Sequence, residues 1–252
     1  MEKINYRLTP LSSLIISPRN NLALYRELGE FSIEQISDSD CLKKNKLRVI
    51  YPFYQYGEYG KYEEYVPGSG AYYLPGSSIK GALCQKDQDA NQFMVDDVAV
   101  PAEAIVLRNL QKVQYLKEEK KACQEPFFDH VGVEMVKKGV VLNGECYKDQ
   151  LEIFKELIYK ANRTAKKRIG SMRERLLRLE QKAYSDKLCG VFHEVAEKLE
   201  CVAENDNVFL LGGYKGLFHS MEVKADLPET EGAVFLDLEA MLTHGLVKIE
   251  IV

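Results

Sequence analysis

The feature that most limits how this chain can fold is a change in the spacing of its apolar residues at Asp149. Before that point, apolar side chains alternate with polar ones or form short β-branched runs, which is typical of strands. From 149 to about 202, apolar residues recur every three or four positions, which predicts two or three amphipathic helices. After these helices, the runs VFLLGGYKGLFHSMEVKA, GAVFLDLE and GLVKIEIV return to the strand pattern.

A shorter helix is predicted earlier, where SSIKGAL follows an apolar run. The order strands, one helix, strands, long helices, strands predicts an α+β fold. This order is compatible with a ferredoxin-like (RRM-like) βαββαβ core, in which SSIKG opens the first crossover helix and the stretch 149–202 is an enlarged second crossover. Gly170 and the capping residue Ser171 mark the expected break between long helices. We expect residues 1–252 to form a single unit of this kind.

Composition limits the class of protein. A chain of 252 residues with 46% hydrophobic and 29% charged residues has ordinary globular usage. The six cysteines show no CxxC pair or zinc spacing and follow no secretory leader, which predicts free thiols in a reducing cytoplasm. No apolar stretch approaches the roughly 20 residues of a membrane helix. We expect no cofactor and no small-molecule substrate, and a net charge of −4 means that any polyanion must meet a local basic patch.

The strand-to-helix junction in AYYLPGSSIKGAL is a candidate anion site. The first amides of a helix lack partners within the helix and carry partial positive charge, so they stabilise a phosphate. Gly76 lets the main chain approach closely, and Ser77 or Ser78 can cap the helix or donate a hydroxyl. Lys80 adds a formal charge one turn later. A plain capped helix, with Gly81 allowing tight packing, explains the same residues equally well.

A second glycine cluster follows an apolar strand in VFLLGGYKGLFHS. Gly212, Gly213 and Gly216 enclose Tyr214 and Lys215. Glycine lets successive amides point at one acceptor, while tyrosine and lysine offer a stacking face and a charge, which suits a sugar-phosphate chain. A glycine bulge or hairpin would have the same sequence.

Two further segments have open interpretations. Residues 50–73 are rich in tyrosine and glycine, which favours strands around turns with tyrosines shielding a sheet edge over a surface that stacks unpaired bases. The predicted long helices carry the clearest local positive charge, which favours an RNA or acidic protein partner over a solvated face with pairs such as Glu174 and Arg178. These basic residues are Lys160, Arg163, Lys166, Lys167, Arg168, Arg173, Arg175, Arg178, Lys182 and Lys187.

Taken together, these motifs resemble a known family. YLPGSSIKGAL closely resembles the (I/V)PGSS(I/L)KGA(L/I)R signature of the RAMP superfamily of CRISPR-associated proteins, and LLGGYKGL resembles their C-terminal glycine-rich loop. FMVDDVAV, the opening YRLTPLSSLIIS and the closing GLVKIEIV also have counterparts there. A long helical stretch before the glycine loop is most similar to the subunit that caps the crRNA 3′ end in type III-A (Csm) effector complexes.

The resemblance implies a function. Such subunits have ferredoxin-like domains, hold guide RNA by its shape and backbone, help its maturation and complex assembly in antiviral defence, and are not catalytic. It implies RNA contacts at Gly76, Ser77, Ser78, Lys80 and residues 212–216, with crRNA and other effector subunits as partners. The basic residues Arg163, Lys166 and Lys167 are expected to contribute. Two departures weaken specific contacts: Ser12 and Ser13 replace the family's first glycine turn, together with Ile16 and Pro18, and Cys84 replaces the arginine that closes the signature.

Two alternatives remain open at this point. A related RAMP class processes pre-crRNA with a histidine general base, for which His219 beside the glycine loop is the candidate, although a partly buried histidine near a strand end is the simpler interpretation. Backbone subunits of type III complexes cleave target RNA with an early aspartate, and Asp38 lies in the corresponding region. Asp96 and Asp97 could hold a metal but are more typical of a turn. The third hypothesis is a protein adaptor whose basic helices dock on neighbouring subunits.

Overall fold

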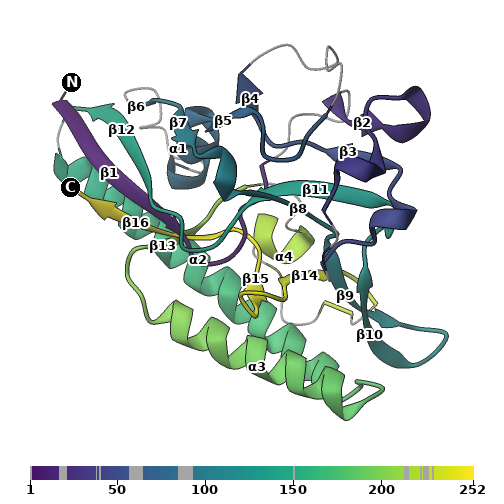
Figure 1. The fold of residues 1–252 in the computed structure, drawn as a ribbon. Helices are drawn as coiled ribbons and strands as arrows, with labels where there is room; N and C mark the ends of the chain where they lie inside the picture. Colours follow the sequence, from purple (N-terminus) through teal and green to yellow (C-terminus); the bar gives the residue numbers. More distant parts are fainter. Residues whose placement is uncertain are drawn as a thin grey trace.

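The computed structural model describes residues 2–16, 22–37, 39, 41–56, 65–84, 93–149, 151–212, 216–221, 223, 227–228 and 230–252. Strands from the whole length of the described chain form several small sheets, and two long helices run along one side of them (Figure 1). The two ends of the chain lie side by side, because the Val252 amide donates to the Asn5 carbonyl at 3.0 Å.

Five antiparallel strands form the first sheet, in the order β13-β16-β1-β12-β6. β1 lies at its centre, where Leu8 pairs with Leu142 on one side and with Ile249 on the other. From Ile4 to Pro10, even-numbered β1 residues such as Tyr6 are buried, whereas odd-numbered ones such as Arg7 are exposed or half-buried, as strand alternation requires. These strands are β1 (Glu2–Pro10), β6 (Met94–Val95), β12 (Leu142–Lys148), β13 (Val208–Leu210) and β16 (Leu246–Ile251).

The buried face of this sheet is covered by α1 (Gly76–Cys84) and by the first half of α2 (Leu151–Glu180). The Tyr6 and Phe154 rings lie 6.1 Å apart, and Ile79 of α1 is fully buried in the same apolar cluster. Burying a side chain of this size stabilises the fold by about 1.5–3 kcal/mol. Cys84 also faces this core, so the position where the resembling signature has an arginine is here an apolar one.

The helical stretch contains two helices, and the predicted break at Gly170 is wrong. α2 continues through Gly170 to Glu180, because Ile169 and Met172 are buried and anchor the helix on both sides of the glycine. The chain turns later, and Ser185 caps α3 (Asp186–Ala203) by accepting a hydrogen bond from the Leu188 amide at 3.3 Å. The free-energy cost of one glycine in a helix is smaller than the free energy gained by burying Ile169 and Met172.

The remaining strands form three smaller sheets. The second has the order β10-β9-β14-β15, the third β2-β3-β11-β8 and the fourth β4-β5-β7, and β3 and β11 are parallel. Their bounds are β2 (Leu24–Tyr25), β3 (Val49–Tyr51), β4 (Gln55–Tyr56), β5 (Ala71–Leu74), β7 (Val98–Val100), β8 (Ile105–Arg108), β9 (Gln111–Leu116), β10 (Lys121–Pro126), β11 (Val131–Val136), β14 (Val234–Asp237) and β15 (Leu242–Thr243). A second apolar core lies between the second sheet and the long helices.

The α+β class is confirmed, and the topology has one departure from a simple ferredoxin-like unit. β1, β12 and β6 neighbour one another as the first, third and second strands of such a unit do, and α1 precedes β6. β13, which follows the long helices, would then lie directly beside β1. Instead, the last strand β16 lies between β13 and β1 and pairs with both.

The segment after β13 is helical rather than a strand. α4 (Gly216–Ser220) begins at the last glycine of the second cluster, and Phe218 and His219 are its buried residues. The prediction that strand structure continues from 208 through this segment is therefore wrong at residues 216–220. None of the helices that the structure describes is long and apolar enough to cross a membrane.

Candidate nucleic-acid interface

The junction of β5 and α1 places Gly76 in a tight contact. A Cβ atom at this position would lie 2.1 Å from the Val95 carbonyl oxygen, so the backbone of the segment after β6 fits only against a glycine. The Gly76 amide donates to Asp97 Oδ1 at 2.8 Å. Glycine is therefore required here for packing, and the first amide of α1 already has an anionic partner from within the chain.

Asp97 caps the N-terminus of α1, although it lies 21 positions after Gly76 in the sequence. Its carboxylate occupies the position where an external phosphate was expected, at the positive end of the helix. The Ser78 amide donates to the Pro75 carbonyl at 2.9 Å. Ser77 is exposed, and Ser78 and Lys80 are half-buried. RNA contacts at Ser77, Ser78 and Lys80 thus stay predictions, whereas a phosphate at the Gly76 amide would have to displace Asp97.

The tyrosine-rich segment contributes both buried and exposed rings. Tyr65 and Tyr72 are buried, and both donate their hydroxyls to Glu134 Oε1, at 2.6 and 2.9 Å. Tyr56 is 58% exposed and stacks on Tyr73, with ring centroids 4.2 Å apart and 17° between planes. Residues 57–64 lie outside the described residues.

The Tyr56–Tyr73 stack lies next to the start of α1. The Tyr56 hydroxyl donates to Asp97 Oδ2 at 3.5 Å, and Asp97 in turn accepts from the Gly76 amide. A flat, exposed aromatic pair beside a helix N-terminus offers a surface on which an unpaired base could stack.

The second glycine cluster is also held by backbone packing. Gly212 has a φ of +98°, and a Cβ atom there would lie 2.2 Å from the Ile15 carbonyl oxygen. Gly216 has a φ of +72°, and its Cβ would lie 2.9 Å from the Ala233 carbonyl oxygen. Both positions therefore require glycine for conformational and steric reasons. Gly213, Tyr214 and Lys215 lie outside the described residues.

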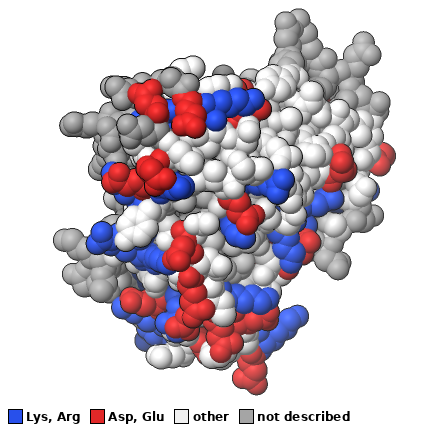
Figure 2. Space-filling view, turned by 90° about the vertical axis from the view of Figure 1, so that its left-hand side faces the viewer, with Lys and Arg blue, Asp and Glu red and all other residues white. Residues whose placement is uncertain are grey.

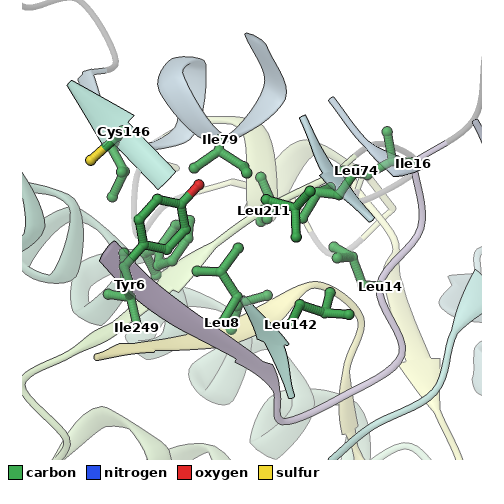
Figure 3. Packing of buried hydrophobic residues seen from close by; sticks show 14 of the residues in the cluster. Tyr6, Leu8, Leu14, Ile16, Leu74, Ile79, Leu142, Cys146, Leu211 and Ile249 are labelled. Carbon is green, nitrogen blue, oxygen red and sulfur yellow. The ribbon is translucent and has the colours of Figure 1, made fainter. Parts of the chain in front are cut away.

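The two signature-like segments meet in one core. Leu74 and Ile79 flank the PGSS turn, and Leu211 directly precedes Gly212. All three are buried members of the same apolar cluster, and Figure 3 shows their side chains around one interior space above Leu8 of β1. Segments about 130 residues apart in sequence are thus packed against the same face of the first sheet.

The basic residues of the long helices do not form a free positive face. Four of them are paired with carboxylates: Lys160 with Glu156, Lys166 with Asp206 at 2.9 Å, Arg173 with Glu200 at 2.9 Å, and Arg178 with Glu174. On the face that carries both chain ends, cationic and anionic side chains are intermingled (Figure 2). Lys167 and Arg163 are exposed on α2. Four of the ten basic residues are thus paired with carboxylates from α2, α3 and the following turn, so the net positive charge of this run is smaller than its sequence indicates, and binding of a partner there stays a prediction.

Two arginines from the same run point inward and hold α4 in place. Arg168 Nη1 donates to the His219 carbonyl at 2.8 Å. Arg175 is 3% exposed, and its Nη2 donates to the carbonyls of Pro228 and Glu231 at 3.0 and 2.8 Å. Its guanidinium also lies over the Phe218 ring, 5.1 Å from the centroid. These contacts attach the segment after the glycine cluster to α2.

We expect Arg175→Met to lower the free energy of unfolding by about 2 kcal/mol, because the charged hydrogen bonds of a buried guanidinium are lost. Faster amide hydrogen exchange over residues 216–221, together with a lower urea midpoint, would show the loosening of α4. Arg163→Met on the exposed face of the same helix is the matched control and should stay within about 0.5 kcal/mol of the parent. Equal effects of the two substitutions would contradict the assigned role of Arg175.

The ribonuclease candidates are placed as follows. His219 is fully buried within α4, not partly buried near a strand end, and its Nε2 lies 3.1 Å from the His244 carbonyl oxygen. Asp38 lies outside the described residues. Asp96 and Asp97 serve local structure: Asp97 caps α1, and the Tyr147 hydroxyl donates to Asp96. The described part of the chain contains no group of metal-ligating side chains.

Ser12 and Ser13 bind within the protein where the resembling family has its first glycine turn. The backbone amide and the hydroxyl of Ser13 both donate to Asp237 Oδ2 at 2.7 Å. The Leu246 amide donates to Ser12 Oγ at 3.1 Å. Burial opposes ionisation of Asp237, but His244 and the bonds from Ser13 lower its pKa below the ordinary value. This turn is an internal junction between β1 and the C-terminal strands.

The sequence patterns did not predict the structural roles of two residues in this region, Asp97 and Glu134. The role of Asp97 depends on a partner 21 positions away, so no local signal could reveal it. Glu134 was likewise unremarkable in sequence. Its isolated charge within VGVEMV was the only available signal, because a carboxylate inside a buried strand must find donors.

Comparison with known proteins adds little to this picture. No family model matches the sequence, and no curated protein matches it. Among solved structures, the chain is similar to a chain in the cryo-EM structure of a Csm-crRNA-target RNA ternary complex of a type III-A CRISPR-Cas system. The alignment covers 99% of this chain and 100% of the other, with 11% identity and a TM-score of 0.46. A likeness at this level does not by itself establish a function.

Proposed function

We propose that the protein is a non-catalytic RNA-binding subunit of a type III CRISPR ribonucleoprotein, most like the type III-A subunit that binds the 3′ region of the guide RNA. In this role, its partners are crRNA and other effector subunits, and it acts in the cytoplasm without a cofactor. The observation that carries the proposal is the packing of Ile79 and Leu211 in one core, because it joins the two segments that resemble the RAMP signature and the glycine-rich loop.

The proposal assigns the RNA contacts to particular groups at this site. Gly76 and Gly212 position the backbone, and Asp97 already binds the Gly76 amide, so contacts are assigned to the groups around them. Ser77 and Ser78 offer hydroxyls, Lys80 offers a charge, and Tyr56 offers an exposed ring. Tyr214 and Lys215 complete the site in this proposal on the basis of sequence alone. Sequence recognition is left to base pairing of the guide, because these contacts reach phosphates and ring faces.

The absence of catalysis in this proposal is consistent with the position of His219. A general base must come within hydrogen-bond reach of the hydroxyl that it deprotonates, and a fully buried imidazole cannot do so without opening of α4.

We expect Lys80→Glu to weaken binding of labelled guide RNA about tenfold near 0.15 M salt, because a cation near phosphate is replaced by an anion. Fluorescence anisotropy at several salt concentrations would measure this and would show a shallower salt dependence than that of the parent. Lys198→Glu is the matched control, because Lys198 is a lysine on another helix, is exposed, and pairs with Glu194 away from the site.

Two outcomes would overturn the proposal. One is an unmodified protein that does not bind single-stranded RNA or guide RNA. The other is cleavage of the RNA that is abolished by His219→Ala or Asp38→Ala, which would make the protein a ribonuclease. Loss of complex assembly with unchanged RNA binding would instead support the adaptor hypothesis.

A further inference from the structure

One face of the third sheet is covered at its Val133 end by Leu110 and Phe235 and is open at its Tyr25 end, where apolar and aromatic side chains are exposed. Tyr25 of β2 pairs with Val49 of β3, and Val49 pairs with Val131 of β11. One step along the sheet, Tyr51 pairs with Val133. Because cross-strand partners point to the same side, these residues form one continuous face. The opposite side of the same strands packs inward around Leu24 and Ile50 and around Glu134.

Two adjoining hollows lie on this face. The larger has a volume of about 420 Å³ and is lined by Tyr25, Glu27, Leu28, Arg48, Val49 and His130. The smaller, of about 60 Å³, is lined by Tyr51, Leu110, Phe127, Phe128, Val131 and Val133. The pairing of Val49 with Val131 connects them across the sheet. The larger hollow is within the size range of pockets that bind small organic groups.

A row of rings borders the hollows. The centroids of Phe127 and Phe128 lie 4.3 Å apart, and those of Phe128 and His130 lie 5.6 Å apart. Phe128, which lines the smaller hollow, is 50% exposed, and Tyr25, which lines the larger one, is 41% exposed. Leu28 beside Tyr25 is 73% exposed. Half-exposed rings held by neighbouring rings are rigid and offer open π-faces.

Cations surround this aromatic face. Lys112 Nζ lies 5.4 Å from the Phe127 ring centroid, and Arg48 lines the larger hollow. Lys46 pairs with Asp129 at 2.6 Å, and Lys43 also lowers the pKa of Asp129, after Lys46. Arg48 pairs with Glu27 at 3.6 Å, with both side chains largely exposed. Glu30 accepts from the Tyr25 amide, and Glu125 is the cross-strand partner of Lys112, so four cations and four carboxylates meet at this face. Exposed pairs of this kind are weak enough for a phosphate to replace the carboxylate.

We propose that this face, formed by Tyr25, Val49, Tyr51, Phe128 and His130, binds single-stranded RNA by stacking unpaired bases on its rings. The proposal rests on the proposed function and extends it to a second site, away from the α1 junction. Phosphates of the same strand lie against Arg48, Lys46 and Lys43. The open rings of Phe128 and Tyr25 favour unpaired bases, and the exposed lysine and arginine side chains beside them are the groups that phosphates of the same strand would contact.

The test uses the full-length protein and a labelled, mixed-sequence single-stranded RNA of about twelve nucleotides. We expect Phe128→Ser and Tyr25→Ser each to weaken binding about tenfold, since a stacked base contributes about 1–3 kcal/mol. The loss should be the same at low and high salt, because stacking releases no counterions, whereas Lys80→Glu changes the salt dependence. Tyr159→Ser is the matched control, because Tyr159 is 64% exposed on α2.

Photo-crosslinking of thiouridine-containing RNA gives a second readout that does not depend on folding of the variants. Crosslinks in the peptides around Tyr25 and Phe128 are the expected result. Crosslinks elsewhere, or variants that bind like the parent while Lys80→Glu is weakened, would overturn this second site but leave the proposed function intact. Failure of the parent protein to bind RNA would overturn both. Unchanged RNA binding with lost association of a partner subunit would identify the face as a protein docking surface instead.

Discussion

Gly212→Ala is expected to lower the free energy of unfolding by about 3–5 kcal/mol. The added Cβ would lie 2.2 Å from the Ile15 carbonyl oxygen, so the backbone of one segment has to move. The φ of +98° adds strain of about 1–3 kcal/mol, because side chains disfavour this conformation. Overpacking a well-fitted site adds about 1–3 kcal/mol. Urea unfolding followed by circular dichroism measures the difference.

Gly170→Ala is the matched control for this prediction. Gly170 lies in the middle of α2, and a Cβ atom there meets no other atom within 4 Å. We expect this substitution to raise stability by about 1 kcal/mol, because alanine is the better helix former. Opposite signs at two glycines would show that Gly212 is retained for its contact and conformation. A Gly212→Ala variant as stable as the parent would refute this account and would also remove the structural reason for the glycine-rich segment.

Glu134→Leu is expected to lower stability by about 3–5 kcal/mol. Glu134 is fully buried in β11 and accepts hydrogen bonds from the Tyr65 and Tyr72 hydroxyls and, at 2.9 Å, from the Phe53 amide. A leucine of similar size leaves three buried donors without an acceptor, and each such group costs about 1–3 kcal/mol. We expect the loss of these hydrogen bonds to weaken the attachment of Tyr65 and Tyr72 to β11. Tyr72→Phe removes a single donor and should cost only about 1 kcal/mol.

Glu134 also predicts a pH dependence of stability. Burial raises the pKa of its carboxyl group above the ordinary value, although the bonds from Tyr65, Phe53 and Tyr72 oppose this. As pH rises from the ordinary glutamate pKa towards the raised one, the unfolded chain loses this proton first and binds fewer protons than the folded state. The free energy of unfolding contributed by Glu134 therefore falls over that interval. The test measures the free energy of unfolding of the parent and of Glu134→Gln over a series of pH values. If the two free energies change with pH in the same way, the raised pKa of Glu134 is contradicted.

The features that could be predicted from the sequence are those that local pattern determines. The alternation from Ile4 to Leu8 gave β1, the three-and-four spacing after Asp149 gave α2 and α3, and the turn at Pro75 gave α1. Each depends on residues within a few positions of one another, so the pattern carries the information. The core residues of these elements followed from the same periodicities.

The errors arose where distant segments decide the outcome. Gly170 did not break α2, because Ile169 and Met172 pack on the core and outweigh one glycine. The basic run carries less net positive charge than its sequence indicates, because carboxylates such as Asp206 and Glu200 from other elements pair with it. No count of charges along one segment can show which carboxylates the fold brings to it.

The sequence by itself thus determined the class of fold, the positions of the long helices and the two glycine-bearing segments, since backbone propensity and apolar spacing are short-range properties. Only the tertiary structure decided that the start of α1 is capped by Asp97, that Arg175 turns inward onto Phe218, and that Leu211 meets Ile79. The physical reason is that these contacts join residues dozens to more than a hundred positions apart, and their free energy depends on close packing that exists only when the whole chain is folded.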